Sequence, residues 1–129
     1  MDKKIAQVSG LKVGGFVIFD GKACKITDMQ ISKTGKHGHA KARISAVGII
    51  DGSKTIKVYP GHDKVEVPII EKEGAQILSI QGDSANVMDT KTYETFDLKI
   101  PSDLKGTVKE GDTITYWIII GQKVMMKGR

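Results

Sequence analysis

The chain has 129 residues and a mass of 14.0 kDa, and its 40% hydrophobic and 27% charged content predicts one ordinary folded domain or two very small ones. No apolar run approaches the ~20 residues that span a bilayer, and no secretory signal opens the chain, so no membrane partner is expected. The net charge of +5 is uneven: residues 1–69 carry +6 and residues 70–129 carry −1, which favours a polyanionic partner such as RNA.

Short runs of β-branched and aromatic residues, separated by turn residues, follow one another along the whole chain. In the first half these candidate strands cover residues 15–19, 22–30, 41–50, 54–60 and 64–70. In the second half they cover residues 75–81, 85–89, 92–100, 112–120 and 123–126. Asp20-Gly21 and Asp51-Gly52 are strong signals for tight turns between strands. The pattern predicts an all-β protein made of small barrels.

The one candidate helix covers residues 101–110, and Gly106 weakens it, so a turn or two at most is expected. A single short helix between the third and fourth strands of a five-stranded barrel fits an OB-fold. The expected boundary lies near Pro68, where the net charge changes sign. We therefore predict an SH3-like barrel over residues 1–69, carrying the hairpin motif described next, and an OB-fold barrel over residues 70–129.

The stretch SKTGKHGHAK, residues 32–41, differs from the strands around it. The 22 residues between Asp28 and Asp51 include no acid. The cations in this interval are Lys33, Lys36, Lys41 and Arg43. Because candidate strands approach from both sides, Gly35 and Gly38 should lie at the tip of a long hairpin, where they permit positive φ and leave Lys36 unshielded. A solvated hairpin that happens to be basic is the plain alternative.

Three kinds of site could use this motif. A phosphate-binding P-loop is excluded, because Gln30 and His37 stand where glycine and a hydroxyl residue are required. A metal site from His37, His39 and His62 has no acid within the motif to complete it and only Cys24 as a thiol, so no metal is predicted. RNA contact fits best, with lysines at phosphates and histidines stacking or hydrogen-bonding.

Catalytic chemistry finds little support in the sequence. There is no G-x-S-x-G elbow and no paired set of carboxylates, so no catalytic residue is predicted and the chain is not expected to be an enzyme. Cys24 lies on a candidate strand and is interpreted as a core residue; as the single cysteine it favours a reducing, cytoplasmic location. An unmodified RNA-binding module and a metal-dependent RNA hydrolase remain as alternatives.

The motif, continuing into ARISAVGI, closely resembles the signature of the translation initiation factor 5A family, and the likeness extends along nearly the whole chain. The resemblance implies that deoxyhypusine synthase transfers an aminobutyl group from spermidine onto Lys36. A hydroxylase completes hypusine in many members, but residues 49–70 look more like the archaeal form. No separate cofactor and no small-molecule substrate is implied.

The resemblance also implies a ribosomal partner, contacted through rRNA and peptidyl-tRNA. The modified Lys36 would reach toward the peptidyl-transferase centre and promote peptide-bond formation, notably at consecutive prolines, and also act in termination. The rRNA would catalyse, while the factor holds the tRNA acceptor end in a reactive pose. The residues that would orient Lys36 or bind nearby RNA are Lys33, His37, His39, Lys41 and Arg43.

Overall fold

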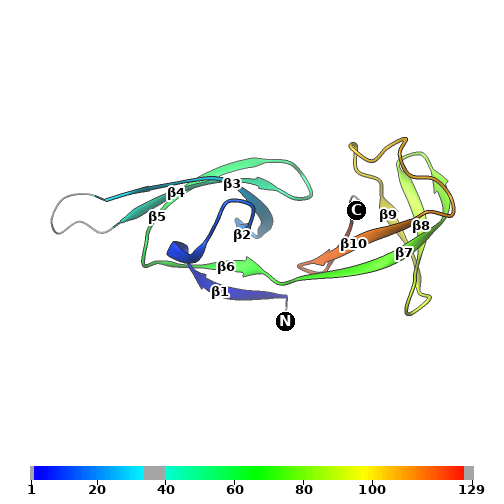
Figure 1. Cartoon of the computed structure of the whole chain (residues 1–129), viewed down its shortest axis with the longest axis horizontal. Coiled ribbons are helices and arrows are strands. Elements are labelled where there is room, and N and C mark those ends of the chain that lie inside the picture. The colour runs from blue at the N-terminus through cyan, green and yellow to red at the C-terminus, as the bar shows by residue number, and fades with distance from the viewer. Residues whose placement is uncertain (1, 34–39, 127–129) are drawn as a thin grey trace. The chain divides into compact units, whose positions relative to one another are not determined.

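The computed structural model describes residues 2–33 and 40–126, and the chain divides into two compact units, Met1–Ile69 and Ile70–Arg129. Within these described ranges the one helical element is a short 3-10 helix, η1 (Val8–Gly10), and all other regular structure is β-strand. The predicted all-β class is therefore confirmed. Each unit has its own antiparallel sheet and its own hydrophobic core (Figure 1).

The first unit is a four-stranded sheet with a separate two-stranded ribbon. Its strands are β1 (Lys3–Gln7), β2 (Phe16–Phe19), β3 (Lys22–Ser32), β4 (Lys41–Gly48), β5 (Lys54–Pro60) and β6 (Lys64–Pro68). The sheet runs in the order β2-β3-β4-β5, while β1 pairs with β6 and β6 lies against β2. The sheet curls around a core formed by Val8, Val17, Phe19, Cys24, Ile26, Ala42, Ile44, Ala46 and Val65.

The predicted turn at Asp20-Gly21 joins β2 to β3. Asp20 has φ 54° and Gly21 has φ 78°, which places both residues in the left-handed region that a two-residue type I′ hairpin requires. Lys57 forms an ion pair with this aspartate, since its Nζ lies 2.7 Å from Asp20 Oδ1. The Asp-Gly signal in the sequence thus predicts both the position and the geometry of this turn.

The second unit is a five-stranded sheet whose edges meet. Its strands are β7 (Ile70–Gln81), β8 (Ser84–Asp89), β9 (Thr95–Lys99), β10 (Thr113–Ile119) and β11 (Gln122–Met126). They run in the order β11-β10-β7-β8-β9, and the edge strands β9 and β11 contact each other, so the sheet curls into a small barrel. Its core is formed by Ala75, Ile77, Ala85, Val87, Leu98, Ile100, Leu104, Ile114, Tyr116 and Met125.

Residues 101–110, where a turn or two of helix at most is expected, form hydrogen-bonded turns. The backbone N–H of Lys105 donates to the carbonyl of Pro101 at 3.2 Å, which completes a single helical turn. Gly106 then adopts φ 81°, and this left-handed residue ends the turn. Leu104, which is 4% exposed, packs the turn onto the core of the second unit.

A nearly buried carboxylate fixes the β8–β9 hairpin of the second unit. Asp89, which is 5% exposed, accepts a hydrogen bond from the Tyr116 hydroxyl and two more from the backbone N–H groups of Lys91 and Thr92, at 2.8 and 2.9 Å. The Tyr116 bond, followed by the backbone bonds, lowers the pKa of the Asp89 carboxyl to about 2. Burial, together with the bond to Asp89, raises the pKa of the Tyr116 hydroxyl.

We expect the second unit to lose stability in acid because of Asp89. Its pKa is lower in the folded chain than the ordinary 3.8, so its contribution is complete above about pH 5 and is lost as the pH falls toward about 2. Urea unfolding followed by Trp117 fluorescence at a series of pH values measures this loss. Asp89→Asn should lower stability at neutral pH and flatten the acid dependence. An unchanged acid dependence in this variant would show that other groups carry it.

Candidate nucleic-acid interface

The motif residues connect the two longest strands of the first unit. β3 and β4 pair from Cys24↔Gly48 out to Ser32↔Lys41, so residues 33–40 form the connection between them. On the β4 side the connection is anchored, since the N–H of Gly61 donates to the carbonyl oxygen of Ala40 at 2.7 Å. A Cβ at position 61 would lie 3.3 Å from that oxygen, which explains the glycine there. The strands β3, β4 and β5 thus form a paired stem, and the β3–β4 connection follows from its end (Figure 1).

Two predicted cations lie on the outer face of this stem. Lys41 and Arg43 alternate along β4 with Ala42 and Ile44, which are 2% and 0% exposed and belong to the core. Because side chains alternate across a strand, Lys41 and Arg43 both face away from the core. Among the described residues, neither has a carboxylate within ion-pair distance. Both cations are therefore available to a phosphate.

The neighbouring edge strand adds an apolar stripe to the same face. In the register of β4 and β5, Arg43 pairs with Val58 and Ser45 pairs with Ile56. Val58 is 58% exposed and Ile56 is 54% exposed. The outer face therefore combines cations that suit phosphates with aliphatic side chains that suit the faces of sugars or bases. The sequence prediction did not include Ile56 or Val58 in the site.

The inner face of β5 explains why these two residues point outward. The ring of Tyr59 stacks on that of Phe19 with 6.1 Å between centroids. The ammonium of Lys57 lies 5.5 Å from the centroid of the same Phe19 ring. The alternation in KTIKVYP does not choose the face by itself, because Ile56 and Val58 are apolar. The packing of Tyr59 against the core places them on the opposite face.

The other predicted site residues divide into two groups. Lys33 is exposed and directly follows the last residue of β3. The remaining predictions lie outside the residues that the structure describes, and they are Gly35, Lys36, His37, Gly38 and His39. The structure therefore brings together Lys41 and Arg43 on one face, while the roles predicted for the motif residues themselves stay predictions.

The alternative sites gain no support from the described residues. No group of three or more histidine, cysteine, aspartate or glutamate side chains in residues 2–33 and 40–126 is placed to hold a metal ion. Cys24 is 1% exposed and belongs to the core of the first unit. Burial raises the pKa of its thiol, which keeps it protonated and a poor nucleophile.

Two family models match consecutive parts of the chain. The model described as translation initiation factor 5A-like, N-terminal, matches residues 2–63. The model described as eukaryotic elongation factor 5A hypusine, DNA-binding OB fold, matches residues 69–129. Translation initiation factor 5A of Methanocella arvoryzae is 47% identical over 120 residues, covering 93% of this chain and 94% of that protein. The chain belongs to the translation initiation factor 5A family.

Other members of the translation initiation factor 5A family match over a similar length. The protein of Methanothermobacter thermautotrophicus is 46% identical over 127 residues, covering 98% of both chains. The solved structure of the Methanococcus jannaschii protein, titled eukaryotic translation initiation factor 5A, superposes with a TM-score of 0.90 at 42% identity, covering 97% of this chain and 93% of that one. A family protein from Naegleria fowleri gives a TM-score of 0.80 at 30% identity, covering 98% of both.

These comparisons confirm the resemblance to the translation initiation factor 5A family, and they confirm that the chain is similar to archaeal members. The chain is a member of a translation factor family, and its second unit matches the family's hypusine OB-fold model. In the described part of the chain, no helix is long and apolar enough to cross a membrane.

Proposed function

We propose that this translation factor binds the ribosome and promotes peptide-bond formation, above all at consecutive prolines, and also in termination. Deoxyhypusine synthase modifies Lys36 with an aminobutyl group from spermidine, and the lengthened side chain reaches toward the peptidyl-transferase centre. The rRNA performs the chemistry, so the factor acts in the cytoplasm by positioning the peptidyl-tRNA and needs no separate cofactor.

The observation that carries this proposal is the paired stem of the first unit. The pairing of β3 with β4 extends as far as Ser32 and Lys41. In the sequence, Lys36 lies in the middle of the segment that connects these two residues. A modified lysine held on a paired stem has a defined base from which to reach. The cations Lys41 and Arg43 on the outer face support RNA as the surface to which the stem docks.

The proposed modification suits a positioning role for physical reasons. An aminobutyl extension of Lys36 gives a thin, flexible thread with a second amine, which remains cationic and can enter a narrow, RNA-lined space. Proline is a poor reactant because its ring fixes φ, so a nascent chain ending in prolines aligns badly. Restraining the reactants in an aligned pose lowers the barrier without a catalytic group on the protein.

Binding to the ribosome should depend on salt through Lys41 and Arg43. Each phosphate contact releases about one counterion, so replacing both residues by glutamine should reduce the slope of log K against log salt by about 2. The measurement is co-sedimentation of the full chain with ribosomes over a series of KCl concentrations.

The matched control replaces two cations that already have carboxylate partners in the same unit. Lys3 lies 3.1 Å from Glu66 and Lys22 lies 2.7 Å from Asp51. Lys3→Gln with Lys22→Gln removes the same charge, yet it should leave the slope nearly unchanged. An equal reduction in the two double variants would mean that net charge, and not the stem face, governs binding.

A further inference from the structure

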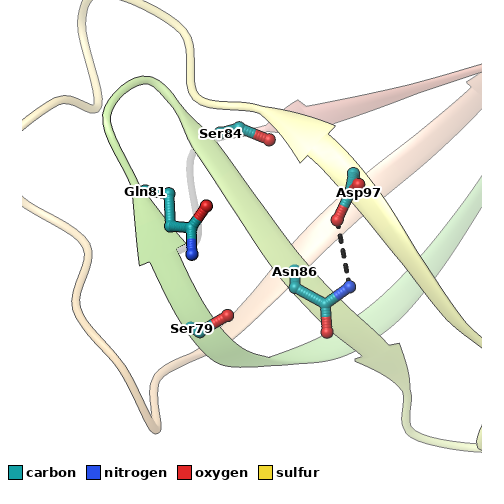
Figure 2. A pocket seen from close by; sticks show the side chains of 5 residues that line it. All are labelled: Ser79, Gln81, Ser84, Asn86 and Asp97. Atoms are coloured by element: carbon teal, nitrogen blue, oxygen red, sulfur yellow. Dashed lines mark hydrogen bonds between the residues drawn. The ribbon is translucent and has the colours of Figure 1, made fainter.

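The second unit has a polar hollow on the outer face of three consecutive strands. It has a volume of about 280 Å³, and its lining side chains are Ser79, Gln81, Ser84, Asn86 and Asp97. This volume is just below the ~300–1,000 Å³ of sites for drug-sized ligands, so the hollow has room for one small group. Figure 2 shows the five side chains and the strands β7, β8 and β9 that carry them.

Strand pairing places these side chains in two adjacent rows. Ser79 pairs with Asn86, which pairs with Asp97, and Gln81 pairs with Ser84 in the next row. On β8 and β9 the residues that flank them along the strand belong to the core, namely Ala85, Val87 and Leu98. A register shift between Ile77 and Ser79 on β7 turns the side chains of Ser79 and Gln81 to the same face as Asn86 and Ser84. The hollow is therefore built by the register of the barrel and not by a surface loop.

One hydrogen bond orients the polar groups of the hollow. Asn86 Nδ2 donates to Asp97 Oδ1 at 3.0 Å (Figure 2). The second carboxylate oxygen of Asp97 and the amide oxygen of Asn86 accept no hydrogen bond from another described residue. The side chains of Ser84 and Gln81 add donors in the adjacent row. The hollow thus has acceptor oxygens on Asp97 and Asn86, and side chains that can donate, those of Ser84 and Gln81, in the adjacent row.

We propose that this hollow binds the Watson–Crick edge of an unpaired guanine in single-stranded RNA. The outer face of the second and third strands is where OB-folds hold oligonucleotides, and in this barrel those strands are β8 and β9. Guanine presents two adjacent donors, N1–H and N2–H, which a carboxylate accepts as a pair. Its O6 acceptor would then face the donors of Ser84 and Gln81.

The other bases fit this arrangement less well. Adenine places its N1 acceptor where guanine has a donor, so it would meet the Asp97 carboxylate with a lone pair. Uracil has a single N–H between two carbonyl oxygens, and cytosine has one amino group beside an acceptor. Unpaired bases are read on these edges in single-stranded RNA. The carboxylate therefore selects guanine by repelling the acceptors of its competitors.

A cation on the same face can hold the RNA backbone. Lys99 pairs with Ser84, so it lies in the same row as Gln81 at the border of the hollow. Among the described residues Lys99 makes no ion pair. A phosphate next to the bound guanine would offset the repulsion between RNA and Asp97. This second RNA contact goes beyond the proposed function, since it needs neither Lys36 nor the ribosome.

The test uses the full chain and short, fluorescently labelled oligouridine RNAs that carry one central variable base. Fluorescence anisotropy should show the guanosine probe binding about tenfold more tightly than the adenosine probe, the discrimination that one bidentate contact supplies. Inosine, which lacks the N2 amine, should fall between them, and 7-deazaguanosine, which keeps the Watson–Crick edge, should match guanosine. Equal binding of the guanosine and adenosine probes would overturn the proposal.

Two charge-matched variants separate base recognition from electrostatics. Asp97→Asn should abolish the preference for guanosine while slightly strengthening binding of every probe, because a negative charge is lost. Asp103→Asn removes the same charge from an exposed turn of the second unit and should keep the preference. In NMR spectra the guanosine probe should shift the amide signals of residues 79–86 and 97. A preference that survives Asp97→Asn, or shifts confined to residues 2–69, would contradict the proposal.

Discussion

Lys36→Arg should abolish the stimulation of proline-rich peptide synthesis, down to the level of Lys36→Ala. Arginine keeps the positive charge and binds phosphate well, so it would replace a simple RNA-contacting lysine almost freely. It cannot accept the aminobutyl group, however. The expected loss in peptide yield is on the order of tenfold or more, as for a misplaced reactant. The measurement is the yield of a polyproline message in a reconstituted ribosome system.

Three comparisons accompany this experiment. Lys33→Arg keeps the charge beside the motif and should retain most of the activity, which controls for disturbance of the hairpin. Unmodified recombinant protein should behave like Lys36→Arg, whereas protein from its native cell should be active. Folding should be unaffected in each case, because the core described for the first unit is built by η1 and the strands. Full activity of Lys36→Arg would leave an unmodified RNA-binding module as the better account.

Ile44→Ala should destabilise the first unit by about 2–5 kcal/mol. Ile44 is 0% exposed and belongs to the core of the first unit, so its truncation leaves a cavity. Ile56 on the adjacent strand is the matched control, because it is 54% exposed and its replacement by alanine should cost no more than about 0.5 kcal/mol.

The two units can be followed separately in this experiment. The single tryptophan, Trp117, lies on β10 of the second unit, so its fluorescence reports that unit. Amide signals of β2, β3 and β4 in NMR spectra report the first unit during a urea titration. Ile44→Ala should lower the urea midpoint of those amide signals. Equal effects of Ile44→Ala and Ile56→Ala would show that burial does not distinguish the two faces of the stem.

Local sequence signals predict the local features of this fold. Alternation of apolar residues predicts the strands, and Asp20-Gly21 predicts a turn whose two φ values are both positive. The expectation of a turn or two at most over residues 101–110 agrees with the single helical turn that forms there, which Gly106 ends and the burial of Leu104 holds in place. The glycine that limits the helix is visible in the sequence, whereas the packing of Leu104 onto the core is not.

The features that depend on distant residues are not predictable in the same way. Asp89 and Tyr116 are 27 positions apart, and their hydrogen bond exists only once β8 and β10 lie in one barrel. The polar hollow likewise requires Ser79, Asn86 and Asp97 to align across three strands after a register shift. Isolated polar residues on strands look like ordinary solvent-facing positions until the register is known.

In the candidate site, too, some features are set by the local sequence and others by contacts between distant residues. The acid-free interval with its central lysine is a property of the sequence, and the resemblance to the translation initiation factor 5A family rests on it. The outward direction of Ile56 and Val58 depends instead on Tyr59 and Lys57 packing against Phe19 from the inner face of β5. Tertiary packing therefore decides which face of β5 the side chains of Ile56 and Val58 occupy.

The proposed function requires that Lys36 carry a spermidine-derived group in the functional protein. The most direct measurement is the intact mass of the protein purified from the cells that make it, followed by fragmentation of the peptide that contains residues 32–41. We expect the mass of one added aminobutyl group, with or without one further oxygen, located on Lys36. An unmodified Lys36 in protein that is active on the ribosome would contradict it.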